Sequence, residues 1–174
     1  MLGLPFEEEK DLEETAYFIE KLQKLKFKLE LSYSVSIFCP KPHTPFQWMP
    51  LYPLKLLKKK IQKLRKFLKN PPWLKLDSPR EAYLQSLLSR GNENTGKLIE
   101  AHDIEKENPL SLIKDLEKTA ILHPEESIEF NFPWDNISVG VKKEYLFEEW
   151  KKAKNKVLTP FCNPKICKRC GACE

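Results

Sequence analysis

The chain has 174 residues, enough for one sizeable domain or for one domain with a small appendage. Its content of 41% hydrophobic and 11% aromatic residues is typical of a globular protein, and its net charge of +5 permits an anionic partner without requiring one. No window of about 18 apolar residues is present, so the sequence predicts no membrane span. The N-terminus lacks the basic and apolar regions of a signal peptide. We therefore expect a cytoplasmic protein whose clustered cysteines bind a metal rather than pair.

The start of the chain predicts a helix followed by a strand. Acids dominate the beginning of residues 7–26 and lysines dominate the end, which matches the two ends of a helix dipole. Residues 29–38 alternate between apolar side chains and Ser32, Ser34 and Ser36, which predicts a strand with a serine face. That face would leave room for a ligand inside a barrel, or would be the exposed face of a sheet.

A proline-rich loop follows at residues 39–50. Its four prolines exclude regular structure and stiffen the chain. A stiff loop at the end of a strand that carries His43, Gln47 and Trp48 is a candidate rim of an active site, or else an ordinary connection. We expect Cys39, at the start of this loop, to be a buried and inert thiol.

The clearest helix is predicted over residues 54–69. Leucine and isoleucine recur there every three or four residues, with eight lysines or arginines and no acid among them. A basic helix face is usually a solvated surface, and the alternative is a surface that binds nucleic acid.

The remainder predicts mostly helices before a short tail. In order, we expect a short strand at 73–76, a helix from the Ser78 cap to Arg90, a helix at about 95–104, a helix capped by Asn108-Pro109, irregular chain at 121–142 and a last helix at 143–156.

Four of the five cysteines lie in the tail with the spacing C-x4-C-x2-C-x2-C, at Cys162, Cys167, Cys170 and Cys173. Thiolates on one tight loop can converge on a metal, and Gly171 lets the backbone fold closely around it. Zinc sites commonly use two separated C-x2-C pairs, whereas C-x2-C-x2-C also occurs in ferredoxins. The spacing therefore favours a [4Fe–4S] cluster, with zinc as the alternative.

The order of several motifs resembles the radical S-adenosylmethionine (SAM) enzymes, in particular uncharacterised members with an N-terminal B12-binding-like domain. Gly3-Leu4-Pro5 followed by acids resembles the segment after the fifth barrel strand, and residues 34–48 resemble the sixth-strand region. Further matching motifs are Ser89-Arg90-Gly91, Pro133-Trp134-Asp135 with Ile137, Gly140-Val141, Lys143, Leu146 and Glu149, and the terminal Cys-x2-Cys-Gly-x-Cys.

The resemblance implies an α/β chain, α+β overall, in three parts. These are the end of a partial (β/α) barrel (1–53), a mainly helical extension (54–157) and a Cys-rich tail (158–174). It also implies two groups of site residues. Gly3, Leu4, Pro5 and Ser36 would contact the cofactor SAM, and His43, Gln47 and Trp48 would contact a substrate.

The C-x3-C-x2-C motif that holds the SAM-cleaving cluster in this family is not in the chain. We therefore expect the C-terminal portion of such an enzyme, inactive alone and partnered by the missing N-terminal half. SAM, and in some members cobalamin, would bind only in the intact enzyme. The competing hypothesis is a zinc-binding module that uses the basic helix at 54–69 to bind RNA.

Overall fold

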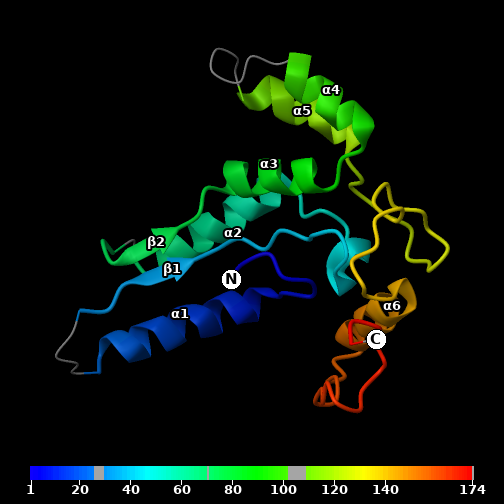
Figure 1. The fold of residues 1–174 in the computed structure, drawn as a ribbon. Coiled ribbons are helices and arrows are strands. Elements are labelled where there is room, and N and C mark those ends of the chain that lie inside the picture. Colours follow the sequence, from blue (N-terminus) through cyan, green and yellow to red (C-terminus); the bar gives the residue numbers. More distant parts are fainter. Residues whose placement is uncertain (26–29, 70, 102–108, 174) are drawn as a thin grey trace. The chain divides into compact units, whose positions relative to one another are not determined.

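The computed structural model describes residues 1–25, 30–69, 71–101 and 109–173 (Figure 1). Contacts divide them into two compact units: unit 1 is Met1–Cys39 with Tyr52–Gln85, and unit 2 is Pro40–Leu51 with Ser86–Glu174. None of the helices described is long and apolar enough to cross a membrane.

Unit 1 is built around three parallel segments. Strand β1 (Tyr33–Val35) pairs in parallel with β2 (Leu74–Leu76), and an isolated parallel bridge joins Leu2 to Ile37. Helix α1 (Glu9–Gln23) lies between the first two segments in sequence, and α2 (Leu54–Phe67) lies between β1 and β2. The unit is therefore two successive β–α–β connections, which confirms a mixed α/β fold.

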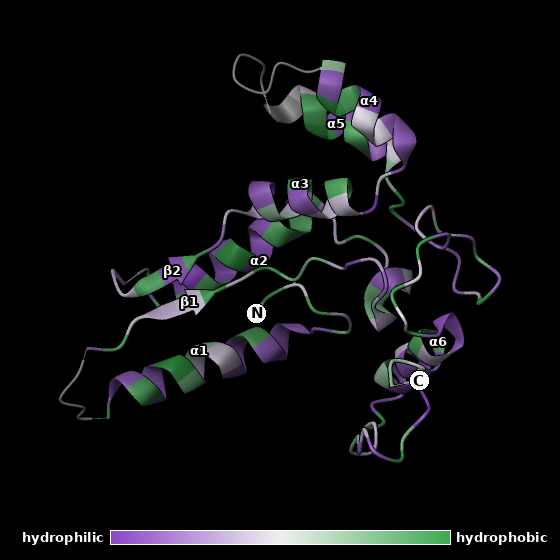
Figure 2. Ribbon diagram, in the orientation of Figure 1, coloured by the Kyte–Doolittle hydropathy of each residue, from purple (hydrophilic) through white to green (hydrophobic). Residues whose placement is uncertain are grey.

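Helices α1 and α2 of unit 1 contact each other and bury one face each. Those faces carry Leu12, Ala16 and Ile19 on α1 and Leu57, Ile61 and Leu64 on α2. Figure 2 shows the same mixture of hydrophobic and hydrophilic residues along both helices. Burial of each large aliphatic side chain contributes about 2 kcal/mol to folding.

The strand predicted at 29–38 is shorter in the structure. Ladder pairing covers Tyr33–Val35 and reaches Ile37 through the bridge, while residues 26–29 lie outside the described part of the chain. The alternation itself is confirmed, because Val35 and Ile37 are buried while Ser34 and Ser36 are exposed. The serine face is thus the exposed face of this small sheet.

Most predicted helices are confirmed with shifted ends. The helix at 54–69 is α2, the strand at 73–76 is β2, and α3 (Pro79–Ser89) follows Ser78, whose hydroxyl accepts from the Glu81 amide. The next helix, α4 (Glu93–Ala101), begins two residues early. The reason is that Asn92 caps it: its side-chain oxygen accepts from the Asn94 amide and its carbonyl from the Thr95 amide.

Unit 2 contains α4, α5 (Pro109–Thr119) and α6 (Lys143–Lys154). The prediction that residues 39–50 lack regular structure was wrong, because Pro45–Trp48 form the 3-10 helix η1. Pro45 stands at its first turn, where a missing N–H costs nothing. An aromatic cluster joins η1, α6 and the irregular chain between α5 and α6; its members are Phe46, Trp48, Phe130, Phe132, Trp134, Phe147 and Trp150.

Candidate functional site

A pocket of about 390 Å³ lies in unit 2 beside the first turn of α6. Its polar lining comes from two stretches that are far apart in sequence: residues 43–47 and residues 131–143. The apolar part of the lining includes Val141 and Leu146. A concave site with a few convergent polar groups is the usual form of a small-molecule site.

Gln47 organises the floor of this pocket. Its side chain is buried, and its Oε1 accepts from the backbone N–H of His43 at 3.0 Å and from Nε1–H of Trp134 at 2.9 Å. His43 has φ of 54°, a conformation that costs a non-glycine residue about 1–3 kcal/mol. The hydrogen bond from His43 to Gln47 offsets this cost, and the one from Trp134 holds the Gln47 side chain in place.

Arg90 holds the backbone of the loop that contains Gln47 and Met49. It is 1% exposed, and it donates from Nη1 to the carbonyl of Met49 at 2.7 Å and from Nη2 to the carbonyl of Gln47 at 3.0 Å. Burial lowers the pKa of Arg90 to about 10, so the guanidinium remains charged at neutral pH. Arg90 is thus a positioning residue that the sequence predicted only as part of a motif.

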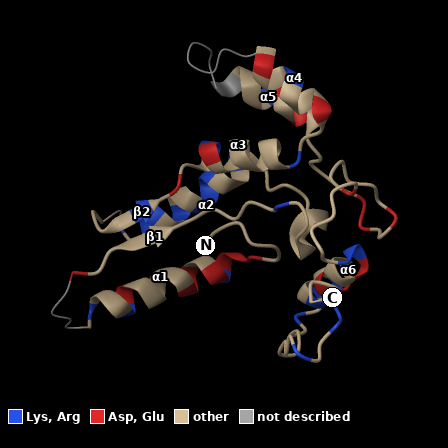
Figure 3. Cartoon of the chain, in the orientation of Figure 1, with Lys and Arg blue, Asp and Glu red and all other residues tan. Residues whose placement is uncertain are grey.

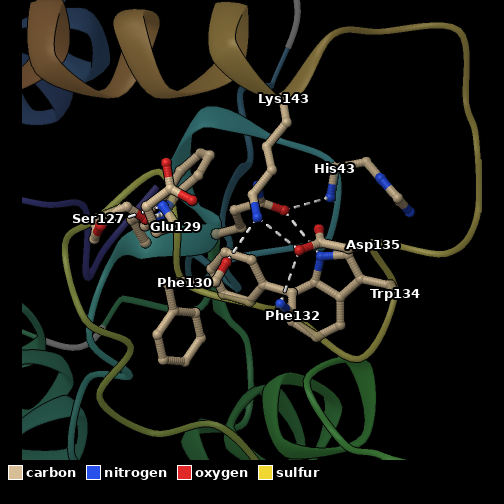
Figure 4. A network of polar contacts seen from close by, with 10 residues as sticks. His43, Ser127, Glu129, Phe130, Phe132, Trp134, Asp135 and Lys143 are labelled. Atoms are coloured by element: carbon tan, nitrogen blue, oxygen red, sulfur yellow. Dashed lines mark hydrogen bonds and ion pairs between the residues drawn. The ribbon is translucent and has the colours of Figure 1, made fainter.

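The opposite wall is fixed by Asp135 and Lys143 (Figure 4). Lys143 Nζ donates to Asp135 Oδ2 and to the carbonyl of Phe130, both at 2.7 Å, and Asp135 Oδ2 also accepts from the Phe132 amide at 2.9 Å. The paired side chains are about one quarter exposed, 26% for Lys143 and 27% for Asp135, so the ion pair alone stabilises little. Its main effect is to tie residues 130–135 to α6.

The lining charges of the pocket cancel, since one lysine faces one aspartate. Amide side chains supply both donors and acceptors, and the His43 ring extends away from the Asp135–Lys143 network (Figure 4). The pocket therefore suits a polar ligand with little net charge.

The predicted substrate residues occupy two different environments. His43 and Gln47 line the pocket. Trp48 is instead 1% exposed: its Nε1–H donates to the carbonyl of Ser127, and its ring packs against Phe132 and Phe147. Trp48 thus supports the loop from within the aromatic cluster.

The predicted cofactor residues lie in unit 1. Gly3 has φ of 78° and donates its N–H to Glu7 Oε2, a turn that disfavours any side chain. Leu4 and Ser36 are exposed and Pro5 is half-buried. A second pocket, of about 640 Å³, opens at the carboxyl ends of β1 and β2 and includes Asp77 and Glu81 in its lining.

Cys39 also lies at the carboxyl end of β1. The thiol was expected to be buried, but the residue is half-buried. The Sγ–H has the carbonyl of Ala82 at 3.3 Å and Gln85 Oε1 at 3.5 Å as acceptors.

The four tail cysteines are free thiols in an exposed loop. A hydrogen bond from Arg169 lowers the pKa of Cys167, while partial desolvation, followed by the charge of Cys167, raises the pKa of Cys162. Within the described residues, no three Cys, His, Asp or Glu side chains are placed to hold one ion. The donor set suits a soft metal or a cluster, so metal binding requires this loop to close.

The tail is attached to the segment that precedes α6. The carbonyl of Cys170 accepts from the Lys142 N–H at 2.8 Å. Gly171 has φ of 86°, and a methyl group at this position would lie 3.0 Å from the Lys142 side chain and 3.3 Å from the carbonyl of Gly140. Thr159 is hydrogen-bonded to Glu149 of α6. The tail is thus attached at Thr159 to α6 and at Cys170 to the residue just before α6, which lies between two residues that line the pocket.

Comparison with known proteins finds one informative relative. The chain is 34% identical over 123 residues to an uncharacterized protein of Methanocaldococcus jannaschii. The alignment covers 70% of this chain and 26% of that protein, so the chain spans about a quarter of the relative's length. No protein-family model matches the chain. No solved structure matches it either.

Proposed function

We propose that this chain is the C-terminal portion of a larger radical SAM enzyme and that its tail cysteines bind an auxiliary [4Fe–4S] cluster. In the intact enzyme, SAM would be cleaved reductively to a 5′-deoxyadenosyl radical that removes hydrogen from a substrate. This portion would supply the end of the barrel, part of the substrate site and the auxiliary cluster.

The order of the parallel segments in unit 1 carries the proposal. Leu2 is next to β1, β1 is next to β2, and α1 and α2 lie between them in sequence. Consecutive strands are neighbours all the way round a (β/α) barrel, so three successive parallel segments are the arrangement that the end of such a barrel would have. The turn at Gly3, the loop after Ile37 and Asp77 all follow the carboxyl ends of these segments, where barrel enzymes keep their active sites.

Two further observations support a part of a larger protein. The relative is much longer than the stretch it shares with this chain. The outer edges of the Leu2 segment and of β2 carry no strand among the described residues, and such edges usually pair with further strands.

The cysteine tail supports the auxiliary cluster. Four thiols in one short loop, with Lys165, Lys168 and Arg169 interspersed, provide the ligands and offset the negative charge of a thiolate site. A fully ligated cluster of this kind has no open iron, so it would serve electron transfer or structure rather than SAM cleavage. Zinc is the alternative metal.

The alternative function is a zinc-binding module that binds RNA through α2. Lys58, Lys59 and Lys66 are exposed on this helix, which favours it. Figure 3 shows basic residues on α2. Lys60 and Lys63, however, pair with Glu7 and Glu9, so part of the basic charge has an internal use. RNA binding that falls steeply with salt, survives loss of the tail cysteines and is abolished by charge reversal at the exposed lysines would select this alternative.

The proposal is tested by 5′-deoxyadenosine formation from SAM under reducing, anaerobic conditions. We expect none from this chain alone, because it lacks C-x3-C-x2-C, and formation when a protein carrying that motif and encoded next to it is added. The added protein should also co-purify with this chain. SAM cleavage by this chain alone, or equal cleavage with and without it, would contradict the proposal.

A further inference from the structure

We infer that the cysteine tail controls the pocket beside α6: metal binding by the tail orders the pocket wall formed by residues 137–143. The inference rests on the proposed function only in requiring that the four cysteines bind a metal. It adds a physical coupling between that metal site and the pocket lined by His43, Gln47 and Lys143.

The first step is that the pocket wall at residues 137–143 has few packing contacts of its own. Residues 136–140 are all exposed, and the segment lies outside any helix or strand. Among them, Gly140 has φ of 76° with open space around its missing side chain. A segment with so few packed neighbours needs an external attachment to keep one conformation.

The second step is that the tail provides such an attachment at the centre of the lining. Val141 and Lys143 line the pocket, and the residue between them, Lys142, gives its N–H to the carbonyl of Cys170. Gly171 lies against the Lys142 side chain and the Gly140 carbonyl. The residues that hold the wall are therefore a predicted metal ligand and its neighbour.

The third step is that metal binding acts directly on this attachment. The loop is held at Thr159 by Glu149 and at Cys170 by Lys142, and the thiols must move to meet at one ion. Closing the loop fixes the backbone of Cys170, because its side chain becomes a ligand. The carbonyl that accepts from the Lys142 N–H then belongs to a loop whose backbone is fixed by the metal.

The consequence is a coupling between the two sites. An ordered wall reduces the entropy that a pocket ligand must remove on binding. By linkage, a ligand in the pocket must raise metal affinity by the same factor. Loss of the metal would then weaken the pocket without any change in its lining residues.

The coupling is tested by amide hydrogen exchange of the full chain with and without one equivalent of Zn²⁺ as the probe metal. In the wild type, we expect zinc to slow exchange at 137–143 by a factor of about ten, the scale of one stabilised hydrogen bond. Lys142→Pro removes the donated N–H at a residue whose φ is already −67°, so we expect zinc binding without protection. Lys142→Ala keeps the N–H and removes the side chain that lies against Gly171, so we expect it to retain the protection if the hydrogen bond carries the coupling.

A second pair of variants keeps the result independent of any folding defect in Lys142→Pro. Gly171→Ala should uncouple the sites, because its methyl group meets Lys142 and Gly140, whereas Gly96→Ala in α4 meets nothing within 4 Å and should not. Zinc binding by the wild type without protection at 137–143 would overturn the coupling and leave the metal site standing. Failure of the chain to bind either zinc or a reconstituted cluster would overturn the metal site and the coupling together.

Discussion

Arg90 shows how one residue can set the shape of a site that it does not line. Its guanidinium is enclosed in unit 2, and two of its N–H groups satisfy the carbonyls of Gln47 and Met49. Gln47 in turn holds His43 and Trp134. A lysine could not reproduce this geometry, because one ammonium cannot match the planar fork that reaches both carbonyls.

We predict that Arg90→Ala destabilises unit 2 by about 3 kcal/mol, because it leaves two buried carbonyls without their charged donor. Urea unfolding followed by tryptophan fluorescence measures this loss, since Trp48, Trp134 and Trp150 are all in unit 2. Arg65→Ala, which removes an exposed arginine from α2, should change stability by less than about 0.5 kcal/mol. Equal effects of the two substitutions would contradict the structural role of Arg90.

Among the individual residues of the pocket, the sequence predicted some and missed others. His43 and Gln47 could be chosen because a stiff loop after a strand tends to present functional side chains. The burial of Arg90 could not be recognised, because an arginine at the end of a helix normally faces solvent. Its burial depends on two carbonyls some forty residues earlier in the chain, a separation of 41 for Met49 and 43 for Gln47.

At the scale of elements, the charges of α1 and α2 are matched. Glu7 lies just before α1 and pairs with Lys60, while Glu9 in the first turn pairs with Lys63. Figure 3 shows acidic residues at the start of α1 and basic residues on α2. The first pair is nearly enclosed, with side chains 7% and 13% exposed, and Glu7 also accepts from the Gly3 amide. The second pair is open, with Glu9 68% exposed.

We predict that Lys60→Ala destabilises unit 1 by about 3 kcal/mol, because Glu7 would remain enclosed without a counter-charge. Lys63→Ala should cost less than about 1 kcal/mol, since its partner is open to water. Amide exchange along α1 measures the difference between these neighbouring lysines. A larger loss of stability in Lys63→Ala than in Lys60→Ala would contradict the prediction that the enclosed pair contributes more than the open one.

Hydrophobic periodicity predicted the elements well where it was strong. The helix at 54–69 was confirmed because leucine and isoleucine mark one face through four turns. The proline-rich loop was misjudged, because proline is compatible with the first turn of a short 3-10 helix. The early start of α4 depends on a cap from Asn92, a local hydrogen bond that the apolar pattern does not register.

At the scale of the whole molecule, the motifs quoted from the sequence gather in two places. Gly3 and the β–α–β connections belong to unit 1, while His43, Asp135 and Lys143 meet at one pocket in unit 2. The sequence predicted an α/β fold and a metal-binding tail, but it could not show that the tail is attached to the pocket wall. That attachment is one backbone hydrogen bond between Lys142 and Cys170, and a backbone amide leaves no signature in the sequence.

The proposed [4Fe–4S] cluster at the tail cysteines is tested most directly by the iron content and visible spectrum of the chain purified and reconstituted anaerobically. We expect about four irons per chain and a brown colour from thiolate-to-iron charge transfer, both lost in the double variant Cys167→Ser/Cys170→Ser, which leaves only two tail thiols. Cys39→Ser is the matched control, because Cys39 belongs to unit 1, and it should retain the full iron content. A colourless protein with one bound zinc, or iron that persists after Cys167→Ser/Cys170→Ser, would contradict the proposed auxiliary cluster.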